Sequence, residues 1–255
     1  MDSKQRFSSR VDDYARYRPG YPRVIADLLQ SRCGLAPGAT VADVGAGTGV
    51  FSRCLLAAGW LVSAVEPNAA MRTRAERDLS SNPRFRSVDG SAEMTTLADR
   101  SIDLVTAAQA FHWFDPIAVG TEWRRILRPP GWAALIWNER DRRYSRFGRD
   151  YHALLLEYAT DAKLVDREHD QPPRIAQLFR DQPYRLETLS YRQVLEFEGL
   201  KGRLMSSSYA PQSGDPRHAP MIEALRALFQ QHQLDGGVTF EYETRVYLGT
   251  LSDLP

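Results

Sequence analysis

A glycine-rich turn between an apolar segment and a helical pattern constrains this chain more than any other feature. The turn lies in T-V-A-D-V-G-A-G-T-G, residues 40–49, where Gly45, Gly47 and Gly49 occupy alternate positions. Compact and β-branched residues before the first glycine predict a buried strand, and apolar residues at helical spacing over 51–56 predict a helix. Glycine also lets a backbone approach a ligand where a Cβ would block it. The stretch therefore predicts a strand, a ligand-binding loop and a helix.

The charge beside the loop separates two classes of ligand. A dinucleotide fingerprint, G-x-G-x-x-G, needs its third glycine at the position of Val50, and Asp43 would place a carboxylate beside a diphosphate. A carboxylate two residues before the glycines instead favours a ligand with a cationic amine and a sulfonium. S-adenosylmethionine is such a ligand, and a nicotinamide dehydrogenase is disfavoured.

Four segments resemble one enzyme family. V-A-D-V-G-A-G-T-G resembles motif I of the class I S-adenosylmethionine-dependent methyltransferases. R-P-G-Y-P (18–22), A-Q-A-F-H-W-F-D (108–115) and W-R-R-I-L-R-P-P-G-W-A-A-L-I-W-N (123–138) resemble a small-molecule subgroup of the type 11 methyltransferases, which includes methylators of carboxylic acids and lipid-like compounds. The resemblance covers roughly the first 140 residues. One departure is R-P-P-G, where the family usually has K-P-G-G.

The resemblance implies a Rossmann-like, doubly wound α/β fold, mostly parallel with an antiparallel C-terminal strand, and a helical cap. We expect a single methyltransferase domain over 1–255. Its expected parts are an N-terminal arm and helix (1–33), a cofactor-binding core (34–138), a helical cap or substrate region (139–183 and 199–232), and late strands of the sheet (184–198 and 237–250).

Apolar runs place further elements of the core. They predict strands at 61–65, 85–88, toward 108 and at 133–137. Trp123, Ile126 and Leu127 indicate a helix that ends before Pro129-Pro130-Gly131.

Glu66 is the second acidic candidate for cofactor binding. It follows the predicted strand 61–65, and a carboxylate there can accept both hydroxyls of a ribose. An acid favoured by the dipole of the next helix is the alternative. The predicted cofactor site also includes Gly45, Ala46, Gly47 and Gly49 of the loop, and Pro67, Met71 and Gln109.

Two further segments are expected to touch the cofactor. S-V-D-G-S-A-E resembles the family's adenine-binding region, with Ser91 where an acid often stands. Ser91, Asp89 or Glu93 could contact the adenine amine, and Ala92 could offer its backbone N–H. Tyr14 and Arg18 of the N-terminal arm are candidates for covering the site, although aromatic residues of the arm could equally dock on the domain.

The aromatic string after the fourth strand should face the same crevice, because ligands in open parallel sheets bind at the carboxyl ends of strands. His112 is the candidate catalytic base or substrate donor, with a structural histidine as the alternative. Trp113 and Phe114 are expected to shape an apolar substrate pocket. Tyr209 is a further substrate candidate, although packing could equally explain it.

Charge and composition limit the partners. Lys plus Arg number 33 and Asp plus Glu 32, a net charge of +1, which does not favour nucleic acid. We expect a small-molecule substrate, no membrane association, a cytoplasmic monomer or homodimer, no metal, and reduced thiols at Cys33 and Cys54. Basic residues after Asn138 would favour an anionic substrate if they point inward. Two alternatives stay open: methylation of tRNA or protein, and a non-catalytic protein that binds S-adenosylmethionine or S-adenosylhomocysteine as a sensor or partner.

Overall fold

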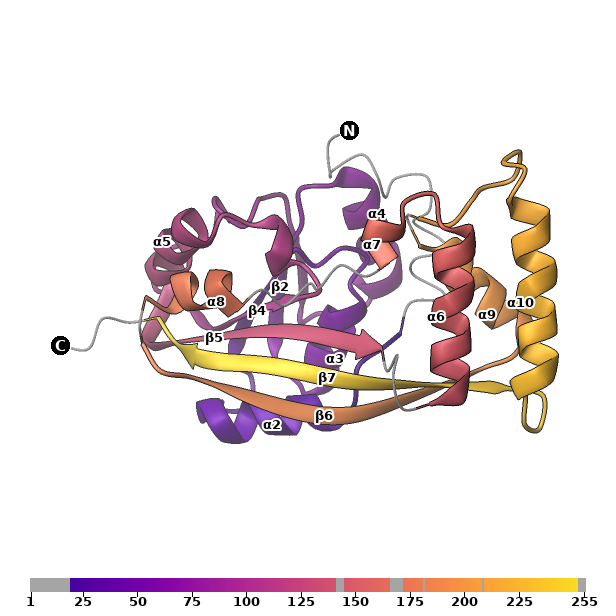
Figure 1. Cartoon of the computed structure of the whole chain (residues 1–255). Coiled ribbons are helices and arrows are strands. Elements are labelled where there is room, and N and C mark those ends of the chain that lie inside the picture. The colour runs from indigo at the N-terminus through magenta and orange to yellow at the C-terminus, as the bar shows by residue number, and fades with distance from the viewer. Residues whose placement is uncertain (1–18, 141–144, 166–171, 181, 208, 252–255) are drawn as a thin grey trace.

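A seven-stranded sheet forms the centre of the computed structural model, which describes residues 19–140, 145–165, 172–180, 182–207 and 209–251 (Figure 1). The strand order is β3-β2-β1-β4-β5-β7-β6. The strands are β1 (Thr40–Val44), β2 (Leu61–Val65), β3 (Phe85–Val88), β4 (Ile102–Ala108), β5 (Leu127–Arg140), β6 (Tyr184–Leu195) and β7 (Val238–Thr250). β1 to β5 run parallel, whereas β7 runs antiparallel to both β5 and β6. The expected α/β sheet, mostly parallel with an antiparallel C-terminal strand, is confirmed.

Helices connect the strands and cover both faces of the sheet. They are α2 (Val24–Cys33), α3 (Val50–Ala57), α4 (Ala69–Leu79), the short 3-10 helix η2 (Phe111–Trp113), α5 (Pro116–Ile126), α6 (Arg146–Tyr158), α7 (Ala162–Val165), α8 (Pro172–Phe179), α9 (Phe197–Met205) and α10 (His218–His232). None of these described helices has the length and apolar character needed to span a bilayer.

The central strands are apolar on both faces because each face is covered. On one face, α5 and α8 pack against the sheet through residues such as Trp123 and Leu178. On the other, Leu29 of α2 and Leu55 of α3 pack against β1, β4 and β5. This two-sided burial explains why four consecutive residues of β1, Val41 to Val44, are all buried, whereas a strand with one solvated face would bury alternate residues.

The last three strands of the sheet extend beyond the central strands. Ala108, the final residue of β4, pairs with Ile136, so residues 137–140 of β5 continue past it by about 13 Å. β7 pairs with β5 as far as Arg140, and β6 pairs with β7 over its whole length. Helices α6, α9 and α10 pack on this extension through a separate apolar cluster that includes Tyr151 and Phe240 (Figure 1).

Several element boundaries differ from the sequence-based expectations. Leu127 belongs to β5 rather than to the preceding helix, because it pairs with Ile102 of β4. β5 also runs through Pro129-Pro130, with an irregularity in its register, whereas the expected strand began at residue 133. β6 ends at Leu195, short of residue 198, because α9 begins at Phe197 and buries Leu200 and Leu204 at helical spacing.

Candidate functional site

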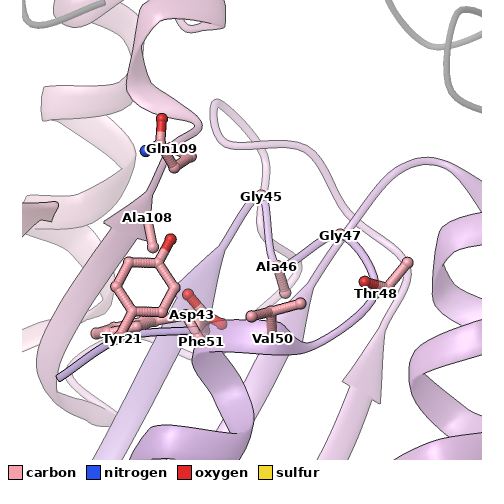
Figure 2. Close-up of a pocket in the computed structure, with 10 residues that line it drawn as sticks. All are labelled: Tyr21, Asp43, Gly45, Ala46, Gly47, Thr48, Val50, Phe51, Ala108 and Gln109. Carbon is pink, nitrogen blue, oxygen red and sulfur yellow. The ribbon is translucent and has the colours of Figure 1, made fainter. Parts of the chain in front are cut away.

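A pocket opens at the carboxyl ends of β1 and β4, where parallel α/β sheets bind ligands (Figure 2). The segment before α2, the end of β1, the glycine loop, the start of α3 and the end of β4 supply its walls. The lining residues are Tyr21, Asp43, Gly45, Ala46, Gly47, Thr48, Val50, Phe51, Ala108 and Gln109. The two predicted segments, the glycine loop and the residues after β4, therefore meet in one place.

Backbone hydrogen bonds hold the glycine loop against β2. The amides of Gly45 and Ala46 both donate to the carbonyl of Val65, at 2.9 and 3.2 Å. Gly47 has a φ of +58° and open space where a Cβ would stand, so its missing side chain leaves room in the pocket. A Cβ on Gly49 would lie only 2.6 Å from Leu79 of α4. Any side chain at position 49 would therefore clash with α4, so the close packing of the loop on this helix requires a glycine.

Gly45 brings the glycine loop against the aromatic segment. A Cβ at Gly45 would lie 2.6 Å from the Cβ of Ala110 and 3.0 Å from the ring of Phe114. The absence of a side chain thus allows the segment after β4 to pack on the loop. The crevice shared by the two segments depends on this contact.

Asp43 is a buried acid at the end of β1. Its side chain is 1% exposed and accepts hydrogen bonds from the hydroxyls of Ser52, at 2.6 Å, and Thr106, at 3.2 Å. Burial raises its pKa to about 6, although these hydrogen bonds oppose the shift and nearby Glu66 adds to it. A cationic group in the pocket would stabilise the ionised form of this carboxylate.

Glu66 connects the end of β2 to the glycine loop. One carboxylate oxygen accepts the amide of Gly47 and the other accepts the amide of Asn68, both at 2.9 Å. Burial raises the pKa of Glu66, and the two backbone hydrogen bonds and Arg72 oppose that shift. Each oxygen can accept a further hydrogen bond, so the predicted contact with ribose hydroxyls is compatible with this geometry.

Residues predicted near Glu66 lie in or beside the first turn of α4. Pro67 precedes Asn68, whose side chain caps α4 by accepting the amide of Met71 at 3.1 Å. Met71 is itself buried at 5% exposure. Neither Pro67 nor Met71 lines the pocket of Figure 2.

The predicted adenine-binding segment forms a local turn after β3. Ser91 exchanges hydrogen bonds with Met94, accepting its amide through Oγ at 3.1 Å. Asp89 pairs with Arg72 at 2.9 Å and is 73% exposed, and the carboxylate of Glu93 accepts the amide of Asp115. Ala92 is buried. Local contacts thus engage Ser91, Asp89 and Glu93, and none of these residues lines the described pocket.

Gln109 has an unusual backbone at the end of β4. Its φ is +56°, a left-handed conformation that costs a non-glycine residue about 1 kcal/mol or more. Its side-chain Nε2 donates to the carbonyl of Asn138 at 3.1 Å. Such strain is often found at functional sites, and here it lies in the wall of the pocket.

The three predicted substrate residues on the aromatic segment have different surroundings. Phe114 is half-buried and lies against Gly45 and edge-on to Trp123. His112 is half-buried with its ring 4.8 Å from that of Trp113, which is 42% exposed. His112 and Trp113 lie on the same short 3-10 helix but do not line the described pocket.

Tyr209 lies between α9 and α10, which together with α6 form the helical cap on the sheet extension. It is partly buried against the apolar cluster of α6, α9 and α10. Its carbonyl accepts the amide of Thr160 at 2.9 Å. Tyr14 and Arg18 lie outside the described residues.

The sequence reasoning missed Tyr21, Thr48, Val50, Phe51 and Ala108, all of which line the pocket. Tyr21 packs edge-on against Phe51, with ring centroids 4.7 Å apart. Its signal was present in R-P-G-Y-P, one of the strings that carry the family resemblance. The others follow from their positions beside the predicted loop and strand.

Neither metal nor disulfide chemistry finds support in the described part of the chain. No group of three His, Cys, Asp or Glu residues there could hold a metal ion. Cys33 and Cys54 are free thiols, and burial raises their pKa values to about 12 and about 11.

Comparisons with known proteins agree on one family. Residues 42–135 match the family model of a methyltransferase domain. An uncharacterized methyltransferase of Mycobacterium bovis is 39% identical over 142 residues, which are 56% of each chain. One from Schizosaccharomyces pombe is 35% identical over 138 residues, 53% of each chain. These matches thus span about half the length of the relatives.

Solved structures of similar fold cover almost the whole chain. A protein of Anaeromyxobacter dehalogenans, described provisionally as a type II methyltransferase, superposes with a TM-score of 0.64 at 22% identity, covering 93% of this chain and 100% of its own. The YcgJ protein of Bacillus subtilis gives a TM-score of 0.56 at 15% identity, covering 90% and 98%. At these identities the likeness establishes the fold.

Proposed function

We propose that this protein, whose residues 42–135 match the family model of a methyltransferase domain, transfers a methyl group from S-adenosylmethionine to a small molecule, either a carboxylic acid or a hydroxylated, partly apolar compound. The observation that carries the proposal is a pair of carboxylates beside the glycine loop, the buried Asp43 and the half-buried Glu66. This arrangement suits a ligand with a cationic amine, a sulfonium and ribose hydroxyls.

The residues present fit that cofactor. Gly47 leaves open space for a ligand, and Asp43 provides a buried negative charge whose described hydrogen-bond partners are neutral. Asp43 would hold the cationic end of the cofactor, and Glu66 would accept the ribose hydroxyls. When bound, S-adenosylmethionine supplies a methyl group carried on a cationic sulfur.

The protein's own task is to position an acceptor and exclude water, because methyl transfer is an in-line displacement. Phe114 packs beside the glycine loop and would form part of an apolar wall. A carboxylate oxygen can attack without a base, whereas a hydroxyl benefits from one. His112 is our candidate for that base or for a hydrogen-bond donor to the acceptor, and Trp113 our candidate for apolar contact with it.

Calorimetric titration with S-adenosylmethionine and S-adenosylhomocysteine tests the proposal. We expect wild-type protein to bind both, and Asp43→Asn and Glu66→Gln to weaken binding at least ten-fold while remaining folded. Asp99→Asn is the matched control, because Asp99 is 75% exposed on the outer surface beside α5. Absence of binding by folded wild type would contradict the proposal.

A methylation screen separates the remaining alternatives. Acids and alcohols are offered with labelled methyl donor, and bulk tRNA and cell protein are offered in parallel. Labelled small-molecule product supports the proposal, whereas label in tRNA or protein would favour a macromolecular substrate. Cofactor binding with no product in any arm would favour the non-catalytic alternative.

A further inference from the structure

Arg203 of α9 is a buried cation inside the cap. Its side chain is 9% exposed, and its Nε has no hydrogen-bond partner among the described residues. The groups that interact electrostatically with its guanidinium are the phenols of Tyr242, Tyr151 and Tyr209. Phenols are neutral at pH 7, so they do not balance a guanidinium.

Arg140 approaches the same tyrosine from the sheet. Its guanidinium lies over the ring of Tyr151, 5.1 Å from the centroid, and its Nε is also buried with no hydrogen-bond partner in the described structure. Both arginines act electrostatically on Tyr151. None of the ion pairs between described residues includes Arg140 or Arg203. The two cations therefore converge without a described carboxylate.

The sheet extension connects Arg140 with the pocket wall. Arg140 is the last residue of β5, on the part of the strand that continues past the end of β4. It follows Asn138 by two residues, about 7 Å, and on the same face of the sheet. Asn138 accepts a hydrogen bond from the pocket-lining Gln109 through its carbonyl and donates to the carbonyl of Gly20, which precedes the pocket-lining Tyr21, at 2.8 Å. Arg140 thus lies two residues along β5 from a residue that is bonded to the pocket wall.

A buried, unbalanced positive charge is costly, and a hydrophobic side chain of similar size would fill the same space at lower cost. A ligand anion would provide the missing balance, and two guanidinium groups offer several directed donors to its oxygens. The two ends of the crevice would then carry opposite charges, each complementary to the ligand that it binds. The carboxylates Asp43 and Glu66 face the cationic donor, and the arginines face the acceptor.

We propose that Arg203 and Arg140, with the hydroxyls of Tyr242 and Tyr209, form the acceptor subsite and select a small molecule carrying a carboxylate or phosphate group. This inference rests on the proposed methyl transfer, for which it names the substrate class. It places the acceptor's charged group in the cap and leaves the atom that receives the methyl group near the aromatic segment.

Anion binding tests the subsite without any need for the true acceptor. Thermal unfolding and calorimetry are run with inorganic phosphate, citrate and succinate at constant ionic strength, with glycerol as a neutral probe. Wild type should show a saturable rise in Tm with at least one anion and none with glycerol. Arg203→Met should abolish the rise, and Arg140→Met should weaken anion binding at least ten-fold.

Arg185→Met is the matched control, because Arg185 is an exposed arginine of β6, and it should respond like wild type. Binding of S-adenosylmethionine should be unchanged in all three variants, which separates failure of the subsite from failure of the proposed function. An anion response equal to wild type in Arg203→Met, or no response of wild type to any of the anions, would overturn the proposal. If Arg203→Met does not fold, an unchanged anion affinity in Arg140→Met overturns it.

Discussion

At the scale of single residues, burial of charge is the feature that distinguishes this site. Asp43 is almost completely buried, with hydroxyl partners, and Glu66 accepts backbone amides of the loop that it supports. Both carboxyls have raised pKa values because burial outweighs their hydrogen bonds. The folded protein therefore maintains negative charge where its ionisation is costly, and a bound cation would offset that cost.

The free energy of unfolding should depend on pH because the pKa of Asp43 is raised in the folded state. Its pKa rises from 3.8 in the reference state to about 6 in the folded state. The folded state then binds the proton more tightly, so stability falls as pH increases between these two values and the penalty is complete above 6. A shift of this size corresponds to about 3 kcal/mol.

Asp43→Asn removes this titration. Between pH 4 and pH 7, the free energy of unfolding of wild type should fall by about 2 kcal/mol relative to Asp43→Asn, the rest of the loss lying below pH 4. Urea denaturation of both proteins at unit pH intervals measures the difference, and titrations common to both cancel. A difference that stays constant across this range would show that Asp43 does not titrate as described.

At the scale of elements, the site is formed by contact between two loops that follow β1 and β4. Ala110 and Phe114 of the second loop pack on Gly45 of the first, and Glu66 accepts the amide of Gly47 in the first loop. Close packing of this kind tolerates no added methyl group without a shift.

Alanine substitutions at Gly45 and Gly47 should separate packing from backbone strain. Both positions have positive φ, which costs an alanine about 1–2 kcal/mol. Only at Gly45 would the new Cβ also collide with neighbours, so Gly45→Ala should lose about 1–3 kcal/mol more in denaturant unfolding. Gly47→Ala should instead lower affinity for S-adenosylmethionine with a small loss of stability. Equal losses of stability in the two variants would contradict the described contact.

At the scale of the whole molecule, Asn138 connects the segment before α2, the end of β4 and strand β7. Its side chain donates to the carbonyl of Gly20 and accepts the hydroxyl of Thr244 of β7 at 2.6 Å. Its carbonyl accepts the side chain of Gln109 at the end of β4. Asn138 therefore connects the wall of the candidate cofactor pocket with the extended strands β5 and β7.

Asn138→Ala should weaken this connection. Loss of the amide leaves the buried hydroxyl of Thr244 and the carbonyl of Gly20 without their hydrogen bonds, at a cost of about 1–3 kcal/mol. Hydrogen exchange around Gly20 and Tyr21 should accelerate, since this segment is held through Asn138. Asn82→Ala, in the loop before β3, is the control and should leave exchange at Tyr21 unchanged. Unaltered exchange in Asn138→Ala would contradict the proposed connection.

Local patterns in the sequence predicted the glycine loop and the individual strands of the core up to β5, whereas the mostly parallel α/β fold was predicted from the family resemblance. β1 and β2 have the expected residues because an apolar run bounded by turn residues has few alternatives. The ends of β5 and β6 were less predictable. β5 continues through two prolines because it pairs with β4 and β7. The strand propensities of the neighbouring residues do not predict this extension.

The sequence by itself determined that one carboxylate lies near the end of a strand, that three glycines follow this strand and that a second carboxylate follows the next strand, because each depends on a few neighbouring residues. Only the tertiary structure decided which of these groups touch. It brought Gly45 against Phe114, placed Tyr21 in the pocket, and enclosed Arg203 and Arg140 around Tyr151. These contacts join residues far apart in the chain, and they are selected by how whole helices and strands pack rather than by local backbone preference.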